Sequence, residues 1–291
     1  MRRLRRSGML LCLGSATAFG GMAVFGKLAY DNGATVGTLL AVRFALAAAL
    51  FWVLILARGG ATEVRSLARC DVALALALGG GIYAAQAGGY FAALARIDAS
   101  LLSLLVYTFP AMVAVVATVR GRDRLDRRRT TALVLAVGGV GLVLAGAGVG
   151  ALDPLGTALG LGTAVVYAGY VLVSEGVAAR VRPQVLAALV ATGAAGTLTA
   201  ASALLGELRP GALTGAGWAW LACIAVVSTV GAVGLFFAGV TRVGATTASI
   251  VSTAEPVVTV LLALAVFGET LGGVQMVGAG LVVGGILVVQ T

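Results

Sequence analysis

Apolar stretches of roughly 18 to 24 residues follow one another along the chain, and a short polar or basic turn separates each from the next. A helix of that length crosses a bilayer, because each residue adds about 1.5 Å and the hydrocarbon core is about 30 Å thick. We therefore predict an all-α integral membrane protein with about ten transmembrane helices. The predicted spans are approximately 9–30, 35–57, 72–94, 99–119, 130–149, 155–178, 184–205, 217–240, 245–267 and 271–289.

The second half of the chain repeats the first. A shift of 146 residues aligns identical residues, among them Phe91 with Phe237, Arg96 with Arg242, Ser103 with Ser249 and Pro110 with Pro256. A shift of 148 residues aligns Phe19 with Tyr167. We expect two related units, residues 1–150 and 151–291, with half of the predicted helices in each.

Arginines mark the orientation of these helices. Most of them lie in the N-terminal segment and in every second loop after it, whereas the other loops hold Arg96 and Arg209. Basic residues of short loops stay in the cytoplasm, so we expect both termini there and a location in the plasma membrane. An odd number of helices per unit makes the two units inverted repeats, the architecture from which secondary transporters build alternating gates.

Composition narrows the function further. With 60% hydrophobic and 11% charged residues, the chain has more apolar surface than a soluble core of this length can hide, so the lipid bilayer is its solvent. The net charge of +9 comes from basic clusters in loops, without interleaved aromatics, and we predict no nucleic-acid partner. The chain lacks histidine and a phosphate-binding loop, and its three cysteines are isolated. We predict no metal, no cofactor and no enzymatic activity.

A motif in the second half has a family resemblance. Its residues are Ala245, Glu255, Pro256, Val257, Leu264, Gly268, Glu269, Leu271, Gln275 and Gly278. With the two predicted sets of helices, this pattern resembles the EamA family of the drug/metabolite transporter superfamily. The resemblance implies a transporter of amino acids, other metabolites or drug-like compounds, and it favours export. The first half departs from the pattern, because Arg122-Asp123 replaces Gly-Glu and no acid precedes Pro110.

Ionisable residues inside predicted membrane helices are expected to have a functional or structural role, because burying a charge there is costly. Glu255 lies roughly 15 Å from the start of its helix, near the midplane. Pro256 beside it frees a backbone carbonyl and lets the helix bend, as Pro110 does in the first half. Glu255 is either a carboxylate that senses protons or substrate at a broken helix, or a buried acid that pairs with a neighbouring helix.

Three other ionisable residues lie within helices. Arg43 either binds an anionic substrate group or is the structural partner of an acid, and we favour the structural role. Lys27 and Glu175 occupy equivalent places in the repeat, each near a helix end. We expect both to extend toward the headgroups rather than to act in transport.

Polar and aromatic residues also recur on single helical faces. Together with Arg43 and Glu255 they are predicted to line a central cavity for a small-molecule substrate; they are Tyr83, Gln86, Tyr90, Ser103, Tyr107, Tyr167, Tyr170, Ser249 and Thr253. The alternative is that each hydroxyl bonds its own backbone and each tyrosine lies at the membrane interface.

The combined hypothesis is a plasma-membrane secondary transporter that exports a small organic metabolite by alternating access. Protons are the candidate coupling ion, passive facilitation is the other possibility, and the oligomeric state is left open. The alternative function is a membrane-embedded lipid-modifying enzyme or a scaffold that transports nothing.

Overall fold

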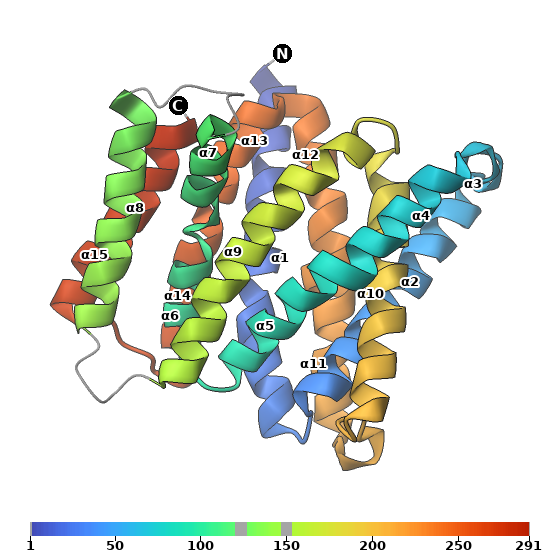
Figure 1. The fold of residues 1–291 in the computed structure, drawn as a ribbon, viewed down its shortest axis with the longest axis horizontal. Coiled ribbons are helices and arrows are strands. Elements are labelled where there is room, and N and C mark those ends of the chain that lie inside the picture. Colours follow the sequence, from blue (N-terminus) through green and yellow to red (C-terminus); the bar gives the residue numbers. More distant parts are fainter. Residues whose placement is uncertain (1, 120–126, 147–152, 291) are drawn as a thin grey trace.

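The computed structural model describes residues 2–119, 127–146 and 153–290, and every regular element in these ranges is a helix (Figure 1). The prediction of an all-α chain is confirmed. Arg122 and Asp123 lie outside the described residues. Including the π-helical turns η1 and η3 and the 3-10 turn η2, the elements are α1 (Arg2–Asp31), α2 (Val36–Ala57), α3 (Ala61–Ser66), α4 (Arg69–Leu78), η1 (Gly79–Tyr83), α5 (Ala84–Leu94), α6 (Ala99–Val106), α7 (Phe109–Val119), α8 (Arg127–Gly146), α9 (Pro154–Ala178), α10 (Pro183–Leu204), η2 (Pro210–Ala212), α11 (Gly215–Ala225), η3 (Val226–Gly231), α12 (Ala232–Val243), α13 (Ala245–Ser252), α14 (Ala254–Phe267) and α15 (Gly273–Gln290).

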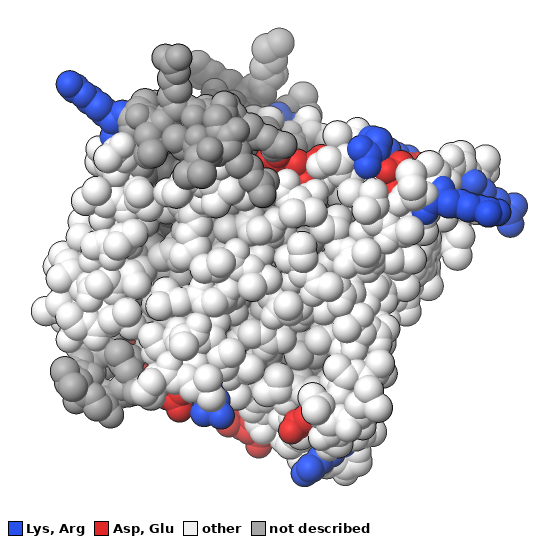
Figure 2. Space-filling view, in the orientation of Figure 1, with Lys and Arg blue, Asp and Glu red and all other residues white. Residues whose placement is uncertain are grey.

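Seven helical segments in the described part of the chain are long and apolar enough to cross a membrane. They are Arg6–Asp31, Val36–Ala57, Arg69–Leu94, Pro154–Ala178, Pro183–Leu204, Gly215–Val243 and Ile250–Phe267. Shorter apolar helices cover Ala99–Val113, Leu133–Gly146 and Gly273–Gly285. Charged residues gather at the two ends of the molecule, and the broad face between them shows almost none (Figure 2). Many large apolar side chains point outward, such as Leu10, Val53 and Val134. The chain is a multi-pass membrane protein.

Two predicted helices are each divided into two pieces. The span predicted at 99–119 separates into α6 and α7, and the span predicted at 245–267 separates into α13 and α14. Pro110 and Pro256 lie in the first turn of the second piece in each case. The N–H groups of a first turn have no acceptor within the helix, so the missing N–H of proline costs no hydrogen bond there. The proline therefore starts a new helix instead of bending a continuous one.

Two other predicted helices are continuous but contain a π-helical turn. η1 joins α4 to α5, and η3 joins α11 to α12. A π-turn accommodates an extra residue without breaking the helix, and in a largely apolar span it does not interrupt the hydrophobic run. The short helix α3, in a basic loop, was also not predicted.

Helices from the two halves of the chain pack against each other. α1 contacts α12 and α14, α2 contacts α10, and α8 lies beside α15 (Figure 1). Gly139 of α8 faces Gly278 of α15, and a methyl group placed on Gly278 would lie 2.6 Å from the carbonyl oxygen of Gly139. The close approach of α8 and α15 thus requires glycine at this crossing.

α1 begins and α15 ends at the same end of the bundle (Figure 1). We call this the terminal end, and the opposite end the distal end. α1 runs from the terminal to the distal end, so its last turns and the loop between α5 and α6 lie at the distal end.

Candidate functional site

A cavity of about 140 Å³ lies between helices from both halves of the chain. Seven residues predicted from the sequence line it, namely Arg43, Tyr83, Gln86, Tyr90, Tyr107, Tyr167 and Glu255. The remaining lining residues are Phe19, Met22, Ala87, Val106 and Phe109. The cavity is therefore mainly aromatic and apolar, with one cation, one carboxyl group, one amide and several hydroxyls, which is a usual composition for a small-molecule site.

A second cavity, of about 350 Å³, shares Phe19, Arg43, Tyr83 and Tyr167 with the first. It extends to Ala178 and Pro183, on either side of the turn between α9 and α10, which lies at the terminal end of the bundle (Figure 1). Tyr170 and Thr229 also line it. The two cavities together reach from the middle of the bundle toward its terminal end.

The three polar residues predicted on the third helix share one face because they are separated by three and four residues. Tyr83 ends η1, and Gln86 and Tyr90 follow in α5. The Tyr83 ring contacts the ring of Tyr170, with centroids 5.1 Å apart. The aromatic wall of the larger cavity is thus shared between the first half of the chain and α9.

Arg43 is buried, with only 4% of its surface exposed, and it projects from α2. Its Nε donates a hydrogen bond of 3.2 Å to Oγ1 of Thr229, and its guanidinium carbon lies 4.7 Å from the ring centre of Phe44 and 5.3 Å from that of Phe91. No carboxylate among the described residues forms an ion pair with it. The favoured prediction, that Arg43 is the partner of an acid, is therefore wrong for the described part of the chain.

Glu255 lies in the first turn of α14, directly after the break between α13 and α14. It lines the smaller cavity together with Tyr107, the residue that follows α6 in the other interrupted span. The first turn of a helix has free N–H groups, which favour a nearby carboxylate. The two helix breaks therefore bring together polar groups of both halves.

Three predicted residues do not line the first cavity. Ser103 is buried in α6, and Thr253 is buried at the break, where its hydroxyl donates to the Ile250 carbonyl at 2.7 Å. For Thr253, backbone bonding, the alternative considered from the sequence, is what the structure contains. Tyr170 lines the larger cavity only. Ser249 belongs to α13, and its side chain lies outside the described part of the chain.

Sequence reasoning missed several lining residues. Phe19 was aligned with Tyr167 by the repeat, and both line the cavity, so the repeat itself was a usable signal. Phe109 packs on Tyr167 with ring centroids 4.4 Å apart, and nothing in its apolar surroundings distinguished it. Thr229 was missed because a lone threonine in an apolar run is common in membrane helices.

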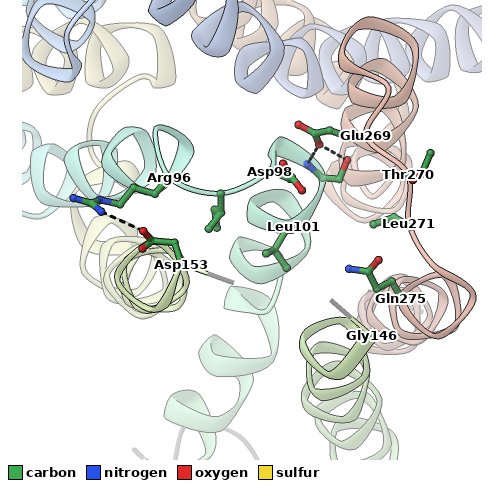
Figure 3. Close-up of a pocket in the computed structure, with 11 residues that line it drawn as sticks. Arg96, Asp98, Leu101, Gly146, Asp153, Glu269, Thr270, Leu271 and Gln275 are labelled. Atoms are coloured by element: carbon green, nitrogen blue, oxygen red, sulfur yellow. Dashed lines mark hydrogen bonds and ion pairs between the residues drawn. The ribbon is translucent and has the colours of Figure 1, made fainter. Parts of the chain in front are cut away.

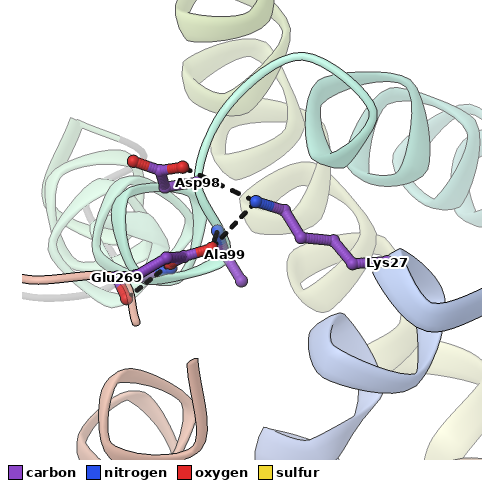
Figure 4. A network of polar contacts seen from close by, with 5 residues as sticks. Lys27, Asp98, Ala99 and Glu269 are labelled. Carbon is purple, nitrogen blue, oxygen red and sulfur yellow. Dashed lines mark hydrogen bonds and ion pairs between the residues drawn. The ribbon is translucent and has the colours of Figure 1, made fainter. Parts of the chain in front are cut away.

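A polar network lies at the distal end, around Glu269 (Figure 4). Nζ of Lys27 lies 2.8 Å from Oε1 of Glu269 and 3.6 Å from Oδ1 of Asp98. The Glu269 carboxylate also accepts hydrogen bonds from the backbone N–H of Ala99 at 3.1 Å, and from the N–H and hydroxyl of Ser100 at 3.0 and 2.8 Å. The network ties α1, the start of α6 and the end of α14 together.

The expectation that Lys27 extends toward the headgroups is wrong, because the side chain pairs with Glu269. Its side chain is only 21% exposed and is held by Glu269, whereas a lysine that reached the headgroups would be free of such a partner. Glu175 is exposed near the end of α9, and its role stays a prediction. Burial raises the pKa of Glu269, but the hydrogen bonds from Lys27 and Ser100 outweigh it, and the pKa lies below its ordinary range.

Beside this network is a polar pocket of about 270 Å³, with Arg96, Asp153 and Gln275 in its wall (Figure 3). Asp153 caps α9 by accepting a hydrogen bond of 2.6 Å from the Gly156 N–H, and it pairs with Arg96 at 3.3 Å. The Gly156 bond, helped by Arg96, holds the pKa of Asp153 below its ordinary range. This exposed ion pair joins the loop before α6 to the start of α9.

An apolar helical bundle that encloses a polar and aromatic cavity defines the class: a multi-pass membrane protein with a central small-molecule cavity. The chain matches the EamA-like transporter family twice, over residues 6–145 and 154–291, and it belongs to that family.

Similar proteins are found both by sequence and by structure. The uncharacterized transporter YcbK of Bacillus subtilis (strain 168) is 28% identical over 283 residues, which cover 94% of this chain and 89% of that protein. A solved structure described as "Crystal structure of protein" is similar with a TM-score of 0.69 at 19% identity, over 97% of this chain and 96% of that chain. At that identity the likeness concerns the fold alone.

Proposed function

We propose that this protein is a plasma-membrane carrier that exports a small organic metabolite, an amino acid or a similar compound, by alternating access. Membership of a transporter family supports the class of activity. The observation that carries the proposal is the cavity shared by both halves of the chain, which holds Arg43 and Glu255 within an aromatic wall. In this proposal the substrate binds there.

The unequal ends of the bundle support alternating access. At the distal end, Lys27, Glu269 and the first turn of α6 are joined by short polar contacts. Toward the terminal end, the larger cavity continues to Ala178 and Pro183. A carrier whose central cavities extend toward one end, with a polar network at the other end, has the form of one state of an alternating cycle.

The orientation and repeat are parts of the proposal. Residues 1–150 and 151–291 form inverted repeats of five membrane helices each, and the terminal end faces the cytoplasm. The structure described here is then the inward-facing state. No observation among the described residues favours the lipid-modifying enzyme or the scaffold.

A reconstitution experiment tests the function. Purified protein in liposomes preloaded with a mixture of unlabelled common L-amino acids is supplied with the same mixture, isotopically labelled, outside, and the uptake of each is read by mass spectrometry. We expect labelled uptake of one or a few of them above the level in protein-free liposomes. Metabolite profiling of cells with and without the protein extends the search to other compounds. Absence of protein-dependent flux in both experiments would contradict the proposal.

Coupling is tested in the same liposomes. Glu255 at the cavity makes exchange of a proton for the substrate our expectation, so an imposed pH gradient should accelerate flux and Glu255→Gln should remove that acceleration. Flux that is indifferent to the gradient would leave a passive carrier. Full transport by Glu255→Gln would remove this carboxyl group from the mechanism.

A further inference from the structure

The two π-helical turns occupy equivalent places in the repeat. The shift of 146 residues that aligns Phe91 with Phe237 also places Tyr83, the last residue of η1, on Thr229 of η3. Both side chains line the larger cavity. π-turns are rare and occur frequently at functional sites. Each half of the chain therefore uses the same backbone irregularity to present one polar side chain to the cavity.

The hydroxyl of Thr229 has a fixed direction. It donates a hydrogen bond of 2.9 Å to the carbonyl oxygen of Ile224, five residues earlier. A hydroxyl has one hydrogen to donate, so toward Arg43 the Thr229 oxygen can only accept. It accepts the hydrogen bond of 3.2 Å that Nε of Arg43 donates. The π-turn supplies the Ile224 carbonyl that makes this arrangement possible.

The Arg43 guanidinium has a second edge, which bears its two terminal amino groups. Within the described residues, the Nε bond to Thr229 is the hydrogen bond that Arg43 makes, and the guanidinium carbon lies over the rings of Phe44 and Phe91. The side chain lines both cavities. A buried guanidinium presents two parallel N–H groups at this edge, and these match the two oxygens of a carboxylate.

We propose that Arg43 binds the carboxylate of the transported substrate, and that Thr229 is the positioning residue that aims the guanidinium. This proposal rests on the proposed transport function and names its substrate class. Glu255 lines the smaller cavity with Arg43 and disfavours a second negative charge, so the class is a monocarboxylate whose remaining part is uncharged or cationic. The aromatic wall accommodates that remaining part.

The variants that test the proposal are Thr229→Val and Thr229→Ser. Valine has the shape of threonine without the acceptor, whereas serine keeps the hydroxyl. We expect Thr229→Val to raise the KM for the best-transported L-amino acid about tenfold with little change in kcat, and Thr229→Ser to restore the wild-type KM. Thr192 is the matched control, because its hydroxyl accepts from Nε1 of Trp52 at 2.9 Å and donates to the Ala188 carbonyl at 2.7 Å, and it does not line the described cavities. Thr192→Val should leave the KM unchanged.

Carboxamides of the same amino acids test the role of Arg43. We expect the wild-type protein to discriminate against the carboxamide at least tenfold, and Arg43→Lys, which keeps the charge but loses the paired N–H groups, to raise the KM for the carboxylate. If Thr229→Val does not fold, the comparison of carboxylate and carboxamide transport by the wild-type protein tests the proposal by itself.

Two results would overturn the proposal while leaving transport intact: equal transport of acid and amide by the wild-type protein, or a wild-type KM in a folded Thr229→Val. If the wild-type protein transports none of the amino acids or metabolites tried, the proposed function and this inference fail together.

Discussion

The carboxylate of Glu269, after the end of α14, accepts hydrogen bonds from the backbone N–H and the hydroxyl of Ser100, 169 residues earlier in the chain. Ser100 lies in the first turn of α6, whose N–H groups have no partner within the helix. Glu269 therefore caps a helix of the other half while it pairs with Lys27 of α1. An acid of the second-half sequence motif thus connects α1, α6 and the end of α14 at the distal end.

We predict that Glu269→Ala destabilises the protein more than Lys27→Met. Removing the carboxylate leaves the N–H groups of Ala99 and Ser100 without an acceptor and Lys27 without its partner, at a cost of about 1 to 3 kcal/mol for each group that remains buried. Removing the ammonium group leaves the helix cap in place. Thermal unfolding in detergent measures both variants.

The control for this prediction is Asp153→Asn, which weakens the exposed pair with Arg96 at the same end of the bundle. Exposed ion pairs contribute little, so we expect a small effect on the melting temperature. Equal losses in Glu269→Ala and Lys27→Met would show that the ion pair, and not the cap, provides the stability.

The network should also depend on pH. Because the pKa of Glu269 in the folded protein lies below its value in the unfolded chain, its contribution is present at neutral pH and is lost as the pH falls through the folded pKa. Lys27 and Asp98 are the charged groups that face it. The difference in melting temperature between the wild-type protein and Glu269→Gln should be constant from pH 7 to about 5 and should shrink below about pH 4. A difference that grows on acidification would contradict the assignment.

Under the proposed transport function, loosening the network should open the cavity to the distal side. Tyr90 lines the cavity, so Tyr90→Cys in a variant without native cysteines reports on access. We expect a membrane-impermeant maleimide, added on the outer side, to label it several times faster when Glu269→Gln is present than when Asp153→Asn is present. Equal labelling rates would show that the network does not control access.

The sequence predicted the helical class and the two prolines at which helices are interrupted, because apolar length and proline act locally. It also predicted seven of the residues around the smaller cavity, since polar side chains of membrane helices face the interior of the bundle instead of the lipid. The partners of these residues could not be predicted in the same way. Lys27 pairs with Glu269 across 242 positions, and no local pattern specifies such a contact.

The partner of Arg43 illustrates the same limit. We expected an acid, because charge balance is the simplest reason for a buried arginine, and the structure instead has the hydroxyl of Thr229 and two aromatic rings. The acceptor depends on a π-turn, which is one extra residue within a helix of unchanged composition. Comparison of the two halves is the sequence signal that aligns Thr229 with Tyr83.

The contact between α8 and α15 gives a test of packing that is independent of transport. A side chain at Gly278 would meet the backbone of Gly139 and Val143, whereas nothing lies within 4 Å of a methyl group placed on Gly280 of the same helix. We predict that Gly278→Val lowers the free energy of unfolding by about 1 to 3 kcal/mol, because the two helices must move apart. Gly280→Val should change it by no more than about 1 kcal/mol. Thermal unfolding of the two variants in the same detergent measures this. Equal effects would mean that helix propensity, and not the close crossing, explains the glycine at position 278.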